Sequence, residues 1–197
     1  MTIKPDAPSC QRNRDVILAL LRDHFSDRKR VLEIGSGTGQ HAVYFGAAMP
    51  QLIWQTSERS EHHDGIRAWL DDAQLPNVLA PIALDVTGAW PAATYDGFFT
   101  ANTLHIMSAA AVEQLFAALP QVMESGAKFA VYGPFNYAGA FTSDSNRDFD
   151  AWLKARDALS GIRDFEWIDQ LAQRAGLKLM EDRAMPANNR GLVWQQA

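Results

Sequence analysis

The chain has 197 residues, of which 47% are hydrophobic and 21% are charged, a balance typical of a globular protein and unlike that of a disordered chain. The formal net charge is −5 and the densest basic run is Arg28-Lys29-Arg30, so no nucleic-acid partner is expected. The single cysteine, Cys10, excludes an internal disulfide and a cysteine-rich zinc site, and no ligand spacing predicts another metal site.

The sequence carries no sign of an export signal or a membrane segment. Residues 1–10 include two prolines and an aspartate, so they lack the apolar core of a signal peptide. No apolar run reaches the roughly 18–20 residues of a membrane span. Together with the lone cysteine, which is typical of a reducing compartment, these features predict a cytoplasmic protein with no membrane partner.

Strand-like and helix-like segments alternate along the chain. Residues 1–10 are expected to form a loose leader, and a helix is expected to start at Asn13 or Asp15. Short apolar runs predict strands at residues 31–34, 52–56, 78–84, 95–101, 129–132, 177–182 and 192–195. Helices are expected at residues 40–49, 61–73, 147–159 and 164–175, and in the stretch that follows Ser108.

Single residues mark several of the expected boundaries. Ser60 and Ser108 are suited to cap the helices that follow them. Pro120 should kink or interrupt its helix. A turn is expected at Ser125-Gly126, and Gly176 should close the helix over residues 164–175.

This alternation predicts an α/β fold, a doubly wound Rossmann-like sheet of about seven strands. The sheet should be mostly parallel with helices on both faces, and the last two strands should form an antiparallel hairpin at one edge. We expect one domain over residues 1–197. Within it, residues 1–14 form an N-terminal leader or lid, and residues 133–147 form a candidate active-site loop rich in glycine, asparagine and aromatics. The aromatic side chains of this loop could close over an acceptor as a lid or could cover the edge of the core.

The first strand runs into a glycine loop, Gly35-Ser36-Gly37-Thr38-Gly39. Glycines permit positive φ and a close approach of backbone to ligand. A Walker loop would need Gly-Lys-Ser/Thr at its end, and a dinucleotide fingerprint would need glycine where Gln40 stands. The loop therefore fits an adenosyl-type ligand or a merely tight strand-to-helix turn.

Two carboxylates stand at the ends of the next two strands. Glu58 lies 19 residues beyond Gly39, where a carboxylate can accept hydrogen bonds from both hydroxyls of a ribose. Asp85 ends the third strand, where it can accept from an adenine amine. Taken alone, Glu58 could be a solvated charge and Asp85 a turn residue, but their joint placement after a glycine loop favours a nucleoside-like ligand.

Residues 31–39 resemble the first motif of the seven-strand S-adenosylmethionine (SAM)-dependent methyltransferases. Five further strings are similar to the methyltransferase-like protein 26 group, a group of unknown substrate; they span residues 37–41, 54–58, 102–106, 133–135 and 185–189. The resemblance implies SAM as cofactor and the following cofactor-binding residues: Glu33, Gly35, Ser36, Gly37, Gly39, Glu58, Asp85, Val86 and Asn102.

The resemblance also implies individual roles. Glu33 would orient the glycine loop or approach the methionine ammonium, and Glu58 would hold the ribose, although the group is expected to have aspartate there. Asp85 with the Val86 backbone would read the adenine, while Asn102 would line the methionine end.

His105 is the candidate catalytic base, because it follows the fourth strand and a histidine pKa lies near neutrality. It could instead be hydrogen-bonded beneath the cofactor or cap the next helix. The acceptor is expected to be a small molecule, since no substrate domain is inserted. Candidate acceptor-contacting residues are Arg12, Asn13, His41, Phe135, Asn136 and Tyr137. Arg12 or Arg14 would suit a carboxylate or phosphate on the acceptor.

Three functions remain open from the sequence. A methyltransferase of a small molecule is favoured, and a non-catalytic SAM sensor or scaffold with the same fold is the alternative. A nicotinamide oxidoreductase is disfavoured by Gln40 and by the absence of a Tyr-x-x-x-Lys pair, since Tyr95 and Tyr132 are followed four residues later by Phe99 and Asn136.

Overall fold

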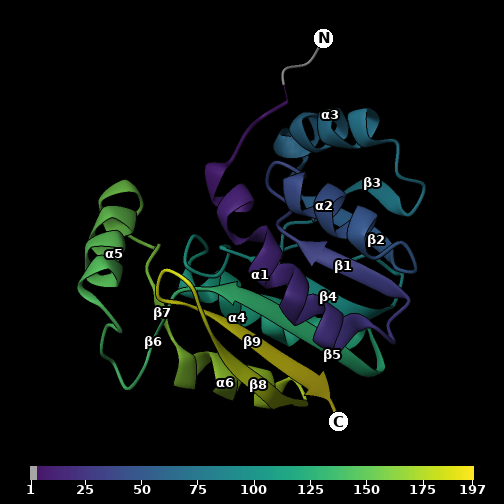
Figure 1. The fold of residues 1–197 in the computed structure, drawn as a ribbon. Helices are drawn as coiled ribbons and strands as arrows, with labels where there is room; N and C mark the ends of the chain where they lie inside the picture. The colour runs from purple at the N-terminus through teal and green to yellow at the C-terminus, as the bar shows by residue number, and fades with distance from the viewer. Residues whose placement is uncertain (1–3) are drawn as a thin grey trace.

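The computed structural model describes residues 4–197 as a central sheet between two layers of helices (Figure 1). The seven strands lie in the order β3-β2-β1-β4-β5-β9-β8. Their bounds are Arg30–Ile34 (β1), Ile53–Glu58 (β2), Val78–Ala83 (β3), Tyr95–Ala101 (β4), Met123–Gly133 (β5), Leu177–Met185 (β8) and Asn189–Gln196 (β9). The pairs from β3 to β5 are parallel, whereas β9 is antiparallel to both β5 and β8. The predicted doubly wound sheet with an antiparallel C-terminal hairpin is confirmed.

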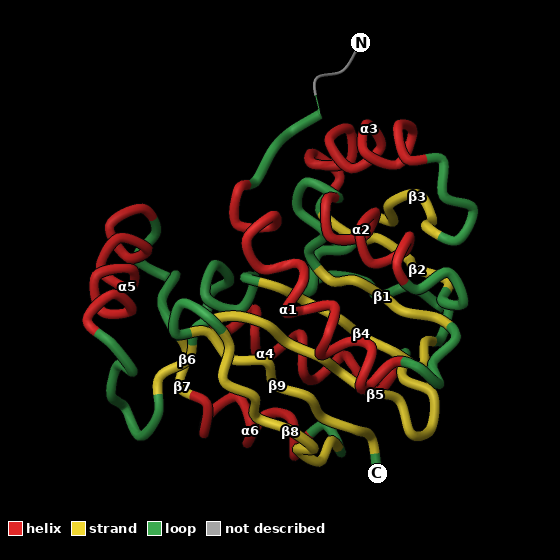
Figure 2. Tube along the Cα trace, in the orientation of Figure 1, coloured by secondary structure: helices red, strands yellow, loops and turns green. Residues whose placement is uncertain are grey.

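Helices cover both faces of this sheet (Figure 2). Their bounds are Pro8–Phe25 (α1), Gln40–Ala48 (α2), His63–Ala73 (α3), Ala109–Ala118 (α4), Asp144–Arg156 (α5) and Phe165–Arg174 (α6). Two short 3₁₀ turns, Ser60–His62 (η1) and Leu119–Gln121 (η2), and a two-residue pair of strands, Phe135–Asn136 (β6) with Arg163–Asp164 (β7), complete the fold. None of the helices in residues 4–197 is long and apolar enough to cross a membrane.

The middle strands are buried on both sides because successive side chains point to opposite faces. Val31 of β1 and Phe99 of β4 belong to the cluster packed under α1 and α2, while Leu32 and Phe98 belong to the cluster packed under α4 and α6. All four side chains are fully buried. This two-sided burial explains why these strands read in the sequence as continuous apolar runs.

Several boundaries differ from the predicted ones at the N-terminal half. Helix α1 begins at Pro8, five residues before Asn13, because proline is well suited to the first helical position. Ser60 opens the 3₁₀ turn η1 and makes no side-chain cap to α3. By contrast, the Ser108 cap is confirmed, since its hydroxyl accepts from the Ala111 amide at 3.1 Å, and the helix gives way to η2 at Pro120 as expected.

In the C-terminal half, too, some predicted boundaries are confirmed and others differ. Strand β5 begins at Met123, so Ser125-Gly126 lies within the strand, at a register shift against β4 where Gly126 has φ +73°. Helix α5 begins three residues early because the Ser143 hydroxyl accepts from the Asn146 amide at 3.1 Å. The predicted end of α6 is confirmed by Gly176, which has φ +78°.

Candidate functional site

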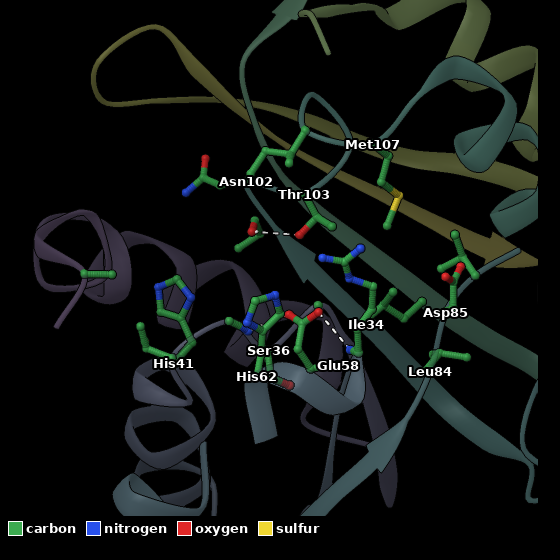
Figure 3. Close-up of a pocket in the computed structure, with 18 of the residues that line it drawn as sticks. Ile34, Ser36, His41, Glu58, His62, Leu84, Asp85, Asn102, Thr103 and Met107 are labelled. Carbon is green, nitrogen blue, oxygen red and sulfur yellow. Dashed lines mark hydrogen bonds between the residues drawn. The ribbon is translucent and has the colours of Figure 1, made fainter. Parts of the chain in front are cut away.

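A cavity of about 950 Å³ opens at the carboxyl ends of β1, β2 and β4 and beside the residues that follow β3 (Figure 3). Ligands of doubly wound sheets bind at this edge, and the volume lies at the upper end of the range for small-molecule sites. Of the residues predicted to bind the cofactor or acceptor, these line it: Gly35, Ser36, Gly37, His41, Glu58, Asp85, Val86 and Asn102.

The glycine loop follows β1 and needs positive φ at all three glycines, which have φ +73°, +56° and +89° at Gly35, Gly37 and Gly39. Gly35 and Gly37 line the cavity. Gly39, predicted to face the cofactor, does not; a Cβ there would lie 3.1 Å from the backbone of Ile66 in α3. The third glycine therefore permits helix packing.

The Gly35→Ala variant is expected to lose more stability than Gly37→Ala. Both replacements force a non-glycine residue into positive φ, which costs about 1 kcal/mol. At Gly35 the new Cβ would also approach the Thr103 side chain to 3.0 Å, whereas at Gly37 nothing lies within 4 Å. Chemical unfolding of the two variants checks this; equal losses would contradict a contact between Gly35 and Thr103.

Glu33 supports the loop from beneath. Its side chain is 2% exposed, and its Oε2 accepts from the Ser36 hydroxyl at 2.9 Å and from the Trp54 indole at 3.0 Å. Burial raises the pKa of this carboxyl to about 7. Of its two predicted roles, orientation of the loop fits these contacts, whereas Glu33 is absent from the cavity lining among residues 4–197.

Glu58 and Asp85 both face the cavity (Figure 3). Glu58, at the end of β2, accepts from the Gly37 amide at 3.1 Å through Oε2 and from the Arg59 amide at 3.0 Å through Oε1. Asp85 accepts from the amide and hydroxyl of Thr87 at 2.9 and 2.7 Å, and these hydrogen bonds lower its pKa. Two oriented carboxylates thus stand where hydroxyl or amine donors of a ligand could reach them.

Asn102 ends β4 at the other wall of the cavity. It adopts φ +56°, a conformation that asparagine tolerates better than most residues, and its amide donates to the Tyr132 carbonyl at 2.8 Å. This bond extends the pairing of β4 with β5 by one residue. The neighbouring Thr103 also lines the cavity, next to Gly35.

His105, the candidate base, lies behind this wall and outside the cavity lining in the described chain. The residue is 5% exposed. Its ring packs edge-on against the Phe149 ring, with 5.3 Å between the two ring centres. Burial, with a smaller effect of the Arg163 charge, lowers its pKa to about 4, so the imidazole is neutral near pH 7. A Cβ built on Gly133 would lie 3.7 Å from His105 Nδ1 and 3.9 Å from Asn102 Oδ1, so the two side chains flank the same point.

The predicted acceptor contacts are only partly brought together. His41 lines the cavity, stacks on Phe45 at 5.2 Å, and its Nε2 lies 2.8 Å from Oδ1 of the buried Asn13. Arg12 is exposed and Arg14 lies over the Tyr44 ring at 4.5 Å. Neither arginine lines the cavity within residues 4–197, so neither is placed to bind an acidic group there.

The loop predicted to close over the site packs elsewhere, and no residue of 133–147 lines the cavity. Phe135 is 2% exposed within the core cluster under α4 and α6. Tyr137 stacks on Phe165 at 5.2 Å and donates to Asp182 of β8 at 2.8 Å. Asn136 is buried, and its Oδ1 has no hydrogen-bond partner among the residues described. Of the two expectations for the loop aromatics, Phe135 and Tyr137 cover the core and do not close over the cavity.

Two parts of the wall are formed by residues that the sequence analysis did not single out. One is the N-terminal segment predicted as a leader or lid, where Pro5, Ala7, Ser9 and Cys10 line the cavity instead of Arg12 or Asn13; proline at position 8 was the available signal for an early helix start. The other is the apolar side formed by residues such as Ile106 and Met107 after β4, which no sequence pattern distinguished from core.

Residues 4–196 match a protein family described as "Protein of unknown function (DUF938)". The chain belongs to the DUF938 family. The match covers nearly the whole sequence, and the family description names no activity.

Solved structures that resemble this chain in fold include methyltransferases. The chain is similar to an O-methyltransferase family protein from Burkholderia thailandensis (TM-score 0.86, 17% identity, covering 96% of this chain and 56% of that one). It is also similar to the SAM-dependent methyltransferase SibL (0.81, 20%, 95% and 55%) and to human N-acetylserotonin methyltransferase in complex with SAM (0.76, 13%, 96% and 53%). The DUF938 chain thus has a methyltransferase fold and spans about half the length of these proteins.

Proposed function

We propose that this protein is a SAM-dependent methyltransferase of a small-molecule acceptor, related to the methyltransferase-like protein 26 group and working in the cytoplasm. The observation that carries the proposal is the joint placement of Glu58 and Asp85 on the lining of one cavity, beside Gly35 and Gly37. The similarity of the fold to that of SAM-dependent methyltransferases supports the same proposal.

The chemistry of the lining fits this cofactor. Glu58 offers carboxylate oxygens to the hydroxyls of a ribose, and Asp85 with Val86 offers an acceptor and a backbone edge to an adenine. Gly35, Gly37 and Asn102 also line the cavity, and a Cβ built on Gly37 would meet no atom within 4 Å, so this part of the lining has space for the methionine moiety. A volume of about 950 Å³ leaves room for a second small molecule beside the cofactor.

When bound, SAM supplies a methyl group on a sulfonium, which an acceptor atom can displace in line. The chain's own contribution would be positioning and exclusion of water, two effects that account for much of the acceleration in such reactions. His105 would take up the acceptor's proton through a ring nitrogen. Its ring is neutral near pH 7 and can accept a proton, although a pKa lowered to about 4 makes it a weak base. Asn102 beside it would orient the acceptor.

A second candidate is a protein of the same fold that binds SAM without transferring its methyl group. The placement of His105 outside the cavity lining, together with the absence of residues 133–147 from it, favours this alternative. The two candidates agree on the cofactor and differ only in turnover.

Thermal unfolding with SAM, S-adenosylhomocysteine and NADH tests the shared part first. Either adenosyl compound at 100 times its Kd should add about 2.7 kcal/mol, or roughly 5–10 °C in Tm for a chain of this size, whereas NADH should add nothing. Formation of S-adenosylhomocysteine in small-molecule extracts, lost in His105→Ala while ligand binding persists, would then favour the enzyme. No shift at millimolar ligand would overturn the proposal.

A further inference from the structure

Residues 4–10, here called the N-terminal strap, lead into α1 and form its first turn (Figure 1). Pro5, Ala7, Ser9 and Cys10 all line the cavity. The strap pairs with no strand of the sheet among the residues described. What holds it in place is therefore a small number of side-chain contacts.

Gln40 at the start of α2 holds the middle of the strap. Its Oε1 accepts from the Ala7 amide at 2.7 Å, and its Nε2 donates to Asp6 Oδ1 at 2.8 Å. Oε1 also accepts from the hydroxyl of Thr38 at 2.9 Å, and Thr38 itself lines the cavity. The side chain at the position where a dinucleotide fingerprint has glycine thus joins the glycine loop to the strap.

Trp69 on α3 holds the beginning of the strap. Its indole donates to the Pro5 carbonyl at 2.7 Å, and Lys4 Nζ lies 4.5 Å from the centre of its ring. Gly65, one turn earlier, leaves space for this approach, since a Cβ there would lie 2.8 Å from the Pro5 ring. Two separate helices therefore fasten the strap on the same side of the cavity.

His41 holds the far end, where the strap becomes helix. Its Nε2 lies 2.8 Å from Asn13 Oδ1, and its Nδ1 lies 3.9 Å from the Cys10 thiol. Burial lowers the pKa of His41 to about 4 and raises that of Cys10 to about 11, so both groups are neutral near pH 7. The His41 ring packs against Phe45 and Phe99 of the core beneath α1, which makes this end the fixed one.

We propose that the N-terminal strap is a movable wall of the cofactor cavity, and that Gln40 and Trp69 are positioning residues that hold it closed over a bound nucleoside ligand. The inference rests on the proposed function. Segments held by few contacts open at a lower free energy than the core, and an element that covers a ligand sets how fast the ligand leaves. Release of either fastening should therefore speed exchange of the ligand without unfolding the chain.

The test uses S-adenosylhomocysteine as the probe and the full chain as the protein. Stopped-flow binding is measured for wild type, Gln40→Ala, Trp69→Phe and Gln173→Ala. Gln173 is a matched control because its amide also donates to a carboxylate, Asp169 at 2.6 Å, on the distant helix α6. We expect the dissociation rate to rise roughly tenfold in Trp69→Phe, as for loss of about one net hydrogen bond, to rise at least as much in Gln40→Ala, which loses the bonds to Ala7 and Asp6, and to stay unchanged in the control.

Two further measurements separate positioning from a general loss of structure. Gln40→Glu keeps an acceptor for the Ala7 amide but places a carboxylate opposite Asp6, so its dissociation rate should be intermediate. The Tm of the unliganded variants should stay within about 3 °C of wild type, while amide exchange at Ala7 becomes faster. Wild-type dissociation rates in both strap variants would overturn the inference alone. Failure of wild type to bind the probe would overturn the proposed function and the inference together.

Discussion

Glu58→Ala is expected to weaken binding of S-adenosylhomocysteine by about 100-fold or more. A carboxylate that accepts two ribose hydroxyls makes two charge-assisted hydrogen bonds, each contributing about 1.5–3 kcal/mol. The variant also removes the acceptor of the Gly37 amide, 3.1 Å away, and so loosens the loop at the centre of the site. Titration calorimetry on the full chain measures the change.

Glu61→Ala is the matched control for this prediction. Glu61 also lines the cavity, but its carboxylate pairs with Arg59 at 3.2 Å and both side chains are 57% exposed. Its loss should change affinity by less than about threefold, since exposed ion pairs contribute little. Glu58→Gln, which keeps one acceptor oxygen, should fall between the two. An affinity of Glu58→Ala within threefold of wild type would remove the central observation from the proposed function.

The sequence was most informative where one physical signal dominated. Residues 95–101 were predicted as a strand and form β4 with the same bounds, because burial on both faces favours apolar residues such as Phe98 and Phe99 at successive positions. Glu58 and Asp85 were recognised because a carboxylate directly after a buried strand must lie at the carboxyl edge of a parallel sheet. Both residues line the cavity in which the cofactor is proposed to bind.

The features that the sequence did not predict depend on contacts between distant residues, which produce no hydrophobic periodicity. Gln40 and Ala7 are 33 residues apart, and a single amide on a helix carries no sign of its partner. Tyr137 and Asp182 are 45 residues apart, so a loop that reads as a mobile aromatic lid is pinned to the sheet edge. The start of β5 was missed because the register shift at Gly126 interrupts its apolar pattern.

Glu33→Gln is expected to remove a large pH dependence of stability near the site. The folded-state pKa of Glu33, raised by burial to about 7, exceeds its ordinary value of 4.5. The folded protein therefore favours the protonated carboxyl. The stability that this group contributes is complete below pH 4.5 and is lost as pH rises through 7. Each pH unit in that window costs about 1.4 kcal/mol, so the total loss is about 3 kcal/mol.

Chemical unfolding of wild type and Glu33→Gln between pH 5 and pH 8.5 checks this prediction through a difference. His41 and His105 have pKa values lowered by burial to about 4, so their contributions are lost as pH falls from 6.5 towards 4. The contributions of the two histidines increase with pH, whereas that of Glu33 decreases. Because both proteins contain the same histidines, these contributions cancel when the two free energies of unfolding are subtracted. The amide that replaces the Glu33 carboxyl in the variant does not titrate. The free-energy cost of placing it beside Ser36 and Trp54 therefore shifts the variant's stability by the same amount at every pH.

The free energy of unfolding of Glu33→Gln relative to wild type should therefore rise by about 2–3 kcal/mol from pH 5 to pH 8.5, with most of the rise below pH 7.5. The same curve bears on the site, because the Ser36 hydroxyl that donates to Glu33 also accepts from the Ser57 amide at 3.1 Å. Ionisation of Glu33 thus places a buried charge directly beneath the glycine loop. Parallel curves for the two proteins would show that Glu33 is already ionised in the folded state at pH 5, stabilised by its two donors against the cost of burial.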